Sequence, residues 1–170
     1  QVTFDQSGLD NTASGTVVTV DAADKVYGDL PFSKWVDDGG TVSYVYTDPV
    51  SSSTSGKQFR LDSVTGPASP ITVSGKTDVT GNYVVQWQVT FKQTGSGVAP
   101  KVTYSIDGGA SVQDTVEFTV WVDSGHQIAY TYESPVAGAP GTQYVLTDTS
   151  PASPQTITAK LDVTGTYKTQ

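Results

Sequence analysis

The side chains that could carry chemistry in this chain are few, because its 170 residues include one histidine and no cysteine. Disulfides, thiolate chemistry and cysteine-ligated zinc are therefore excluded. His126 follows a turn that contains Asp123 and Ser124, and an imidazole beside a carboxylate could act as a general base or a metal ligand. The counterpart of His126 in the internal repeat described below is Gly40. A turn position that glycine fills in a sister copy is typical of a solvated residue, so the sequence predicts no catalytic residue and no enzyme.

Aspartates form the second chemically capable group, with 15 Asp against 2 Glu. Calcium takes six to eight oxygen ligands, which loop carboxylates and carbonyls supply. Nothing in the sequence matches the calcium loop of an EF-hand, and aspartate is also common in turns and at sheet edges. Calcium is thus the single cofactor considered, and its candidate ligands are Asp21, Asp24, Asp29, Asp37 and Asp38.

Internal crosslinks are another chemical alternative. An isopeptide bond requires a buried lysine beside Asn or Asp together with a catalytic carboxylate, and an ester bond requires Thr and Gln. The lysines considered are Lys34, Lys76 and Lys160. No lysine and acid occupy clearly matched core positions in both copies of the repeat, so the sequence favours an uncrosslinked chain.

Aromatic residues recur at matched positions and are expected to be structural. Trp35 and Trp121 are predicted to lie in the core, because large rings at matched positions of a small domain are usually buried. The Tyr-x-Tyr pairs at 44–46 and 130–132 place both rings on one face of a strand. The alternative is that exposed rings stack against a carbohydrate.

Composition and charge restrict the classes of fold and partner. The chain has 24 Val and 25 Thr against 5 Leu, which favours strands over helices and predicts an all-β fold. A net charge of −8 argues against nucleic acid and anionic membranes, which need clustered Lys and Arg. No apolar run approaches the length of a membrane helix, so no membrane insertion of this segment is expected.

An internal repeat divides the chain into two domains, residues 1–86 and 87–170. Blocks such as Trp35–Gly39 and Trp121–Gly125 match one another, and Pro-Ala-Ser-Pro occurs in both halves. The sequence at 83–91 contains no turn signal, so a short, rigid junction is expected, with Tyr83, Gln86 and Trp87 setting the angle between domains. The chain resembles an excision from a longer array of repeats.

Residues 78–83 and 162–167 share the pattern Asp-x-x-Gly-x-Tyr, which resembles a longer form of the corner in immunoglobulin-like domains. In such a corner the hydroxyls of Tyr83 and Tyr167 would bond upstream backbone. Each copy also resembles the immunoglobulin-like repeats of secreted prokaryotic surface proteins, including surface-layer and adhesin repeats. The motifs that carry this likeness are Val-Thr-Phe, Trp-Val-Asp-x-Gly, Tyr-x-Tyr-x-x-Pro-Val and Val-Thr-Gly-x-Tyr.

The resemblance implies two tandem immunoglobulin-like β-sandwiches of about seven short strands each. It also implies a non-catalytic stalk, spacer or adhesive module of an extracellular, cell-surface protein, with neighbouring repeats as its partners. Two alternatives stay open. The chain could be a carbohydrate-binding module that recognises surface glycans, or a filament subunit whose edge strands pair with other copies of itself.

Overall fold

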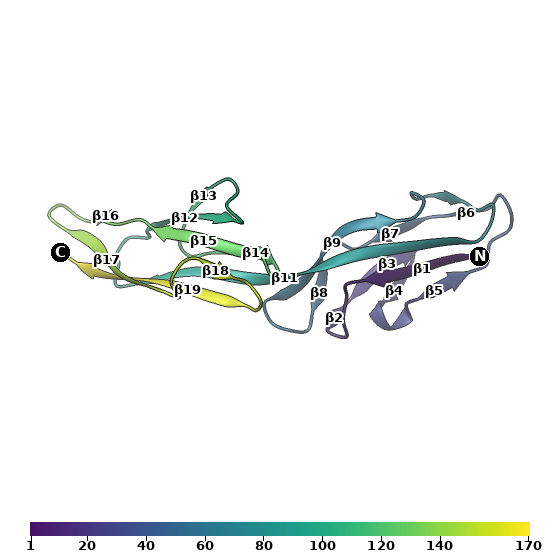
Figure 1. Cartoon of the computed structure of the whole chain (residues 1–170), viewed down its shortest axis with the longest axis horizontal. Coiled ribbons are helices and arrows are strands. Elements are labelled where there is room, and N and C mark those ends of the chain that lie inside the picture. The colour runs from purple at the N-terminus through teal and green to yellow at the C-terminus, as the bar shows by residue number, and fades with distance from the viewer. The chain divides into compact units, whose positions relative to one another are not determined.

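The computed structural model describes all 170 residues, and its regular elements are β-strands apart from one short 3₁₀ helix, η1 (Tyr27–Asp29). The all-β class predicted from the valine and threonine content is confirmed. The chain forms two compact units, unit 1 (residues 1–86) and unit 2 (residues 87–170). A helix with the length and apolarity of a membrane span is absent from the structure. Figure 1 shows the strands of each unit.

The strands of unit 1 are β1 (Val2–Ser7), β2 (Ala13–Ser14), β3 (Thr16–Val20), β4 (Ala23–Val26), β5 (Phe32–Lys34), β6 (Thr41–Val42), β7 (Tyr44–Tyr46), β8 (Val50–Ser52), β9 (Lys57–Thr65), β10 (Ile71–Thr72) and the first part of β11 (Thr77–Thr94). β1 lies between β5 and β11, and β11 continues the sheet to β9, β8 and β2. β4, β3 and β7 form a second sheet, while β6 pairs with β10.

Unit 2 begins with the second part of β11 and contains β12 (Lys101–Ile106), β13 (Val112–Thr115), β14 (Phe118–Asp123), β15 (Gln127–Tyr132), β16 (Val136–Ala137), β17 (Gln143–Ser150), β18 (Gln155–Thr156) and β19 (Leu161–Thr169). Here β11 lies between β14 and β19, and β19 continues to β17 and β16. The other sheet has the order β13-β12-β15-β18. Apart from the short pairing of β2 with β8, the strand pairings of unit 1 thus recur in unit 2.

Period-2 alternation explains why each unit has its own core. Val2 and Phe4 of β1 are fully buried while Thr3 and Asp5 are only partly so, because successive side chains point to opposite faces of a strand. Val79, Gly81 and Tyr83 alternate inward along β11 in the same way. Buried residues form one cluster in unit 1 and a second in unit 2.

The units contain more strand segments than the seven that the sequence predicts. Several of these strands are only two residues long, including β2, β6 and β10. Glycine and proline lie beside these short strands, as at Gly40 and Pro70. Both residue types weaken or interrupt strand pairing, so the strands stay short.

Candidate functional site

The first and last strands of each unit pair in parallel, and we call this pairing the parallel ladder. In unit 1 the ladder joins Val2–Ser7 of β1 to Thr77–Asn82 of β11 through six residue pairs. In unit 2 it joins Val89–Thr94 of β11 to Leu161–Thr166 of β19, again through six pairs. One continuous strand, β11, therefore supplies the closing strand of unit 1 and the opening strand of unit 2.

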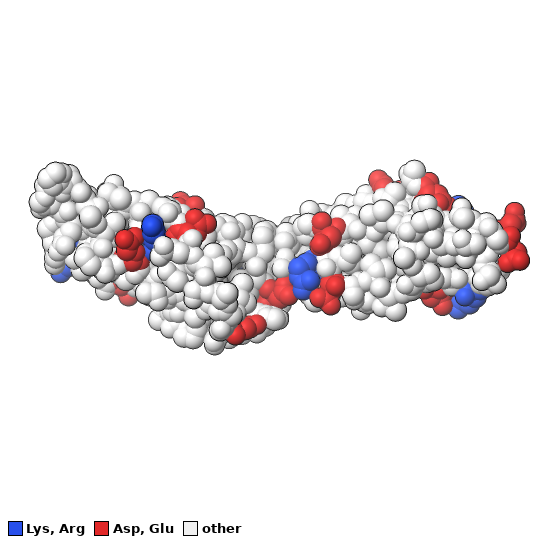
Figure 2. All heavy atoms as spheres, turned by 90° about the horizontal axis from the view of Figure 1, so that it is seen from above, with Lys and Arg blue, Asp and Glu red and all other residues white.

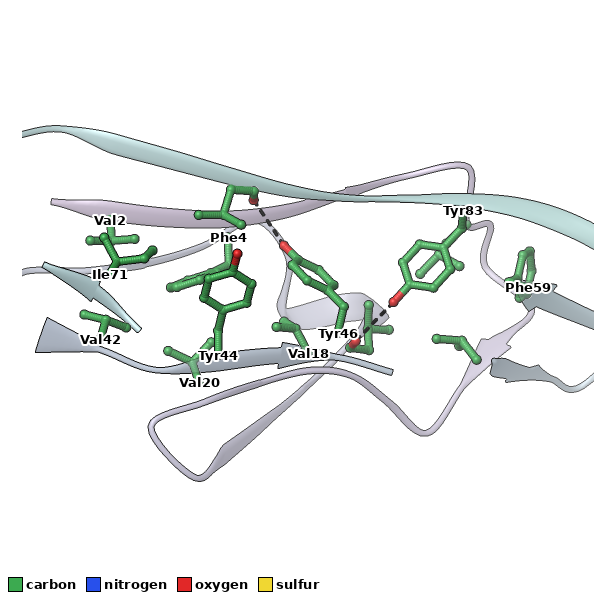
Figure 3. Packing of buried hydrophobic residues seen from close by; sticks show 14 of the residues in the cluster. Val2, Phe4, Val18, Val20, Val42, Tyr44, Tyr46, Phe59, Ile71 and Tyr83 are labelled. Atoms are coloured by element: carbon green, nitrogen blue, oxygen red, sulfur yellow. Dashed lines mark hydrogen bonds between the residues drawn. The ribbon is translucent and has the colours of Figure 1, made fainter. Parts of the chain in front are cut away.

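A buried tyrosine of the facing sheet contacts both strands of each ladder. The Tyr46 hydroxyl lies 2.6 Å from the Asp5 carbonyl oxygen of β1 and 3.1 Å from the Val79 carbonyl oxygen of β11. Figure 3 shows the Tyr46 ring inside the core of unit 1 with its hydroxyl directed at these strands. Burial raises the pKa of Tyr46 to about 12, so the hydroxyl stays protonated and able to donate.

Tyr132 makes the same pair of contacts in unit 2. Its hydroxyl lies 2.7 Å from the Lys92 carbonyl oxygen of β11 and 3.0 Å from the Val163 carbonyl oxygen of β19. Burial raises the pKa of Tyr132 as well. We call Tyr46 and Tyr132 the latch tyrosines, because each one ties both strands of a ladder to the opposite sheet.

The glycine of the Val-Thr-Gly-x-Tyr motif makes room for the latch tyrosine. A Cβ atom on Gly81 would lie 2.5 Å from the Tyr46 ring, and one on Gly165 would lie 2.7 Å from the Tyr132 ring. No side chain fits at such distances without movement of the ring. The motif therefore encodes a close approach between the ladder and the facing sheet.

Tyr83 and Tyr167 bond backbone carbonyls of distant segments. The Tyr83 hydroxyl donates to Thr47 O at 2.9 Å, with Val17 O at 3.3 Å, and the Tyr167 hydroxyl donates to Glu133 O at 2.7 Å. The acceptors lie upstream, as in a tyrosine corner, but more than 30 residues away rather than within the corner itself. The Tyr83 hydroxyl ties β11 to the far side of the core of unit 1 (Figure 3). The Tyr167 hydroxyl ties β19 in the same way in unit 2.

The repeated Pro-Ala-Ser-Pro segment supports the neighbouring tyrosine. Ser69 Oγ accepts the Tyr44 amide at 2.8 Å, and the Tyr44 hydroxyl donates to Pro67 O at 2.6 Å. In unit 2 Tyr130 makes the equivalent bonds to Ser153 and Pro151, both at 2.8 Å. The identical four residues thus perform the same structural task in both units.

The prediction that Trp35 lies in the core is wrong. Its side chain is 79% exposed, whereas its neighbour Val36 packs against the core of unit 1. Adjacent residues of an extended chain point to opposite faces, so an inward valine turns the tryptophan outward. Trp121 is partly buried and adjoins the buried Val122, and it lies outside the core cluster of unit 2. The spacing of the apolar residues beside each tryptophan was the signal for this orientation.

The residues expected at the junction are placed within the separate units. Trp87 is partly buried and packs against the core of unit 2. The Gln86 side chain accepts a hydrogen bond from Gln58 Nε2 at 2.8 Å, within unit 1. Tyr83 belongs to the core of unit 1, as described above.

The five calcium candidates do not converge. No group of three or more histidine or acidic side chains is placed to hold a metal ion. Local partners occupy three of the carboxylates, because Asp21 pairs with Lys34, Asp24 accepts from Thr19 Oγ1 at 2.7 Å and Asp29 accepts the Val26 amide at 3.0 Å. The other two, Asp37 and Asp38, are exposed and lie in or beside the turn at residues 38–39.

The His126 ring pairs with Asp107, and its backbone amide donates to the carbonyl oxygen of Asp123, the partner considered from sequence, at 3.1 Å. Asp107 Oδ1 also accepts the Gln127 amide at 2.8 Å, and these two hydrogen bonds lower the pKa of Asp107. Asp21 occupies the same place in unit 1, where Lys34 and the Ser43 amide at 2.8 Å lower its pKa. Both aspartates have positive φ, 46° and 48°, so each one fastens a tight turn. The hydrogen bond between His126 and Asp107 therefore fastens the turn that Asp107 forms.

None of the lysines considered for crosslinks is buried, and Lys34 is only partly exposed. Lys34 and Lys76 pair with surface aspartates, and Lys160 is exposed. The lysine that sequence reasoning missed is Lys57, whose side chain is 9% exposed and whose Nζ lies 2.5 Å from Asp10 Oδ2. Hydrogen bonds from Lys57 and Thr12 lower the pKa of Asp10 to about 2, which indicates an ion pair between an ammonium and a carboxylate. A covalent amide bond between Lys57 and Asp10 would instead require Lys57 as a neutral amine and Asp10 as an activated acid.

Basic side chains do not gather into a patch. On the face shown in Figure 2 they lie singly, mostly beside acidic residues. Five basic residues each form an ion pair with an aspartate: Lys34, Lys57, Arg60, Lys76 and Lys92.

No model of a known protein family matches the chain, and no curated protein matches it.

Proposed function

We propose that the chain is a non-catalytic structural module that resists tension in a repetitive protein. The observation that carries this proposal is the parallel pairing of the first and last strands in each unit. The function would be mechanical, and it requires no cofactor or catalytic residue.

Parallel pairing determines how a pulling force acts on the backbone hydrogen bonds. In unit 2 the chain enters at the start of Val89–Thr94 and leaves at the far end of Leu161–Thr169. Tension along the chain therefore pulls the two strands in opposite directions along their own axes. All bonds of the ladder then share the load, whereas strands pulled apart at one end lose their bonds one after another.

Two further features support the proposal. The latch tyrosines hold both ladder strands against the facing sheet, which opposes sliding. β11 supplies a strand to both ladders, so the last strand of unit 1 and the first strand of unit 2 are one continuous strand.

Pulling unit 2 of the full chain in two directions tests the proposal. The chain lacks cysteine, so attachment points can be introduced singly. Gln88→Cys with Gln170→Cys places the handles at opposite ends of the ladder and loads it in shear. Gln88→Cys with Lys160→Cys places both handles at the same end and opens the ladder bond by bond. We expect a clearly higher rupture force for the first pair in an optical-tweezers measurement.

Equal rupture forces in the two directions would overturn the mechanical proposal. Urea unfolding of both variants in the absence of force is the matched control. Because neither pair of substitutions removes a core residue, their stabilities should agree and any difference in force must come from direction.

We further propose that each unit is an immunoglobulin-like β-sandwich in an extracellular, cell-surface protein whose partners are neighbouring repeats. The repeated pairing of strands, the separate cores and the acidic, threonine-rich exterior support this proposal. Surface labelling of intact cells with an antibody against the chain tests the location, and labelling only after lysis would contradict it.

A further inference from the structure

Each unit has sheet edges at which a backbone amide bonds a side chain instead of a neighbouring strand. β7 is the outer strand of the sheet β4-β3-β7, and β15 extends beyond its two-residue pairing with β18. The Tyr44 amide of β7 donates to Ser69 Oγ at 2.8 Å. The Tyr130 amide of β15 donates to Ser153 Oγ at the same distance. A serine hydroxyl thus takes the hydrogen bond that a carbonyl oxygen of an added strand would accept.

The opposite edge of these sheets has the same feature. Val26 of the outer strand β4 pairs with the first residue of β3, and Thr115 of the outer strand β13 pairs with the first residue of β12. Asp29 Oδ2 accepts the Val26 amide at 3.0 Å from three residues further along the chain. Asp114 Oδ1 accepts the Thr115 amide at 2.7 Å from one residue before it. The same amide is therefore bonded in both units by aspartates at different positions.

The edges of β9 and β17 provide the third case. β8 pairs with only the first part of β9, and β16 pairs with only the first part of β17. Just beyond these pairings Asp48 Oδ1 accepts the Leu61 amide at 2.8 Å. In unit 2 Ser134 Oγ accepts the Leu146 amide at 3.0 Å. The matched residues differ in type, and they share an oxygen that accepts the edge amide.

We call these six side chains the edge caps: Asp29, Asp48 and Ser69 in unit 1, and Asp114, Ser134 and Ser153 in unit 2. We propose that the edge caps close the sheet edges to strands from other copies of the chain. An added strand binds through the outward amides of an edge, and at a capped amide it would replace an existing hydrogen bond instead of adding one. The aspartates among the caps also place negative charge at the edges, which repels a second acidic copy.

Closed edges affect how copies of the chain associate. Uncovered strand edges are templates for pairing with another chain. The edge caps would keep crowded copies from joining into larger sheets, and they argue against a filament whose edge strands pair with other copies. This inference goes beyond the mechanical proposal, which concerns the hydrogen bonds within each unit.

Removing the caps of unit 2 from the full chain tests the inference. One triple variant combines Asp114→Ala, Ser134→Ala and Ser153→Ala. Its matched control combines Asp114→Asn, Ser134→Thr and Ser153→Thr, which has the same net charge and keeps an oxygen at each position. Sedimentation velocity over a concentration series measures self-association. We expect the alanine variant to associate at least tenfold more tightly than the control, with slower hydrogen exchange of the three uncapped amides at high concentration.

Two results in sedimentation would overturn the inference. The first is an alanine variant that stays folded and monomeric at millimolar concentration, and the second is equal association of the two triple variants. Slower exchange that spares the three uncapped amides would also overturn it, because the association would then use another surface. Circular dichroism shows whether the variants fold. The single variants Ser134→Ala and Ser153→Ala delete one hydroxyl each, and they provide the same comparison if the triple variant unfolds.

Discussion

At the scale of single residues, glycine determines how closely the ladder approaches the facing sheet. The sequence contains the Val-Thr-Gly-x-Tyr motif, and its resemblance to a tyrosine corner predicts a role for the tyrosine but none for the glycine. The contact between Gly81 and the ring of Tyr46 joins residues 35 positions apart. Such a contact depends on how the two sheets face each other, so spacing in the sequence could not reveal it.

Replacing Gly81 with alanine should destabilise unit 1. The new Cβ would lie 2.5 Å from the Tyr46 ring, which must then move away from the ladder. Overpacking of this kind costs about 1–3 kcal/mol. Gly75→Ala is the control, since a Cβ there meets nothing within 4 Å, and we expect a change within about 0.5 kcal/mol. Urea unfolding measures both, and equal stabilities would contradict the close contact.

Acid should weaken the ion pair between Asp10 and Lys57. The pKa of Asp10 is lowered from 3.8 to about 2, so its contribution is complete above pH 4 and is lost as the pH falls through about 2. The carboxylate is half exposed, which limits the contribution to about 1 kcal/mol. Asp10→Asn should therefore lower stability at pH 5 and reduce its loss between pH 4 and pH 2.

Lys57→Met provides the matched comparison for this pair. It keeps the buried apolar stem and removes the ammonium, so it should flatten the same part of the pH profile, and the double variant should add little. Thermal melts from pH 6 to pH 2 give the profiles. Additive losses in the double variant would show that the two residues act independently.

At the scale of elements, β-branched composition and alternation were sufficient to predict strands and an all-β class. The predicted core positions of Trp35 and Trp121 are wrong, because recurrence in both copies does not by itself show burial. Recurrence shows a shared role, while the alternation around Val36 and Val122 determines the face. The parallel partner of β1 could not be inferred either, since strand pairing joins segments about 75 residues apart.

Removing the latch hydroxyl should loosen a ladder without disturbing its packing. Tyr132→Phe keeps the ring and deletes the contacts to Lys92 O and Val163 O, at a cost of about 1–2 kcal/mol. Tyr104→Phe removes a hydroxyl from a ring that stacks near Phe91 and serves as control. Equilibrium unfolding and the shear pulling geometry described above measure the effect. A lower stability with an unchanged rupture force would separate the latch from the mechanical role.

At the scale of the whole molecule, the net charge of −8 attracts cations whether or not a binding site exists. Sequence composition showed this charge, but only the fold shows that the acidic residues are dispersed. No three of them are placed together as metal ligands, and several are engaged by lysines or backbone amides. A diffuse attraction and a specific calcium site differ in their effect on stability.

Calcium should therefore stabilise the chain no more than magnesium does at equal concentration and ionic strength. A site with a dissociation constant 100-fold below the calcium concentration would add about 2.7 kcal/mol, which raises the melting temperature of a small domain by roughly 10 °C or more. Dispersed charges give only the screening that both ions share. Thermal melts in chelator, in millimolar calcium and in millimolar magnesium decide between the two cases. A rise confined to calcium would show that the loop aspartates rearrange to form a site.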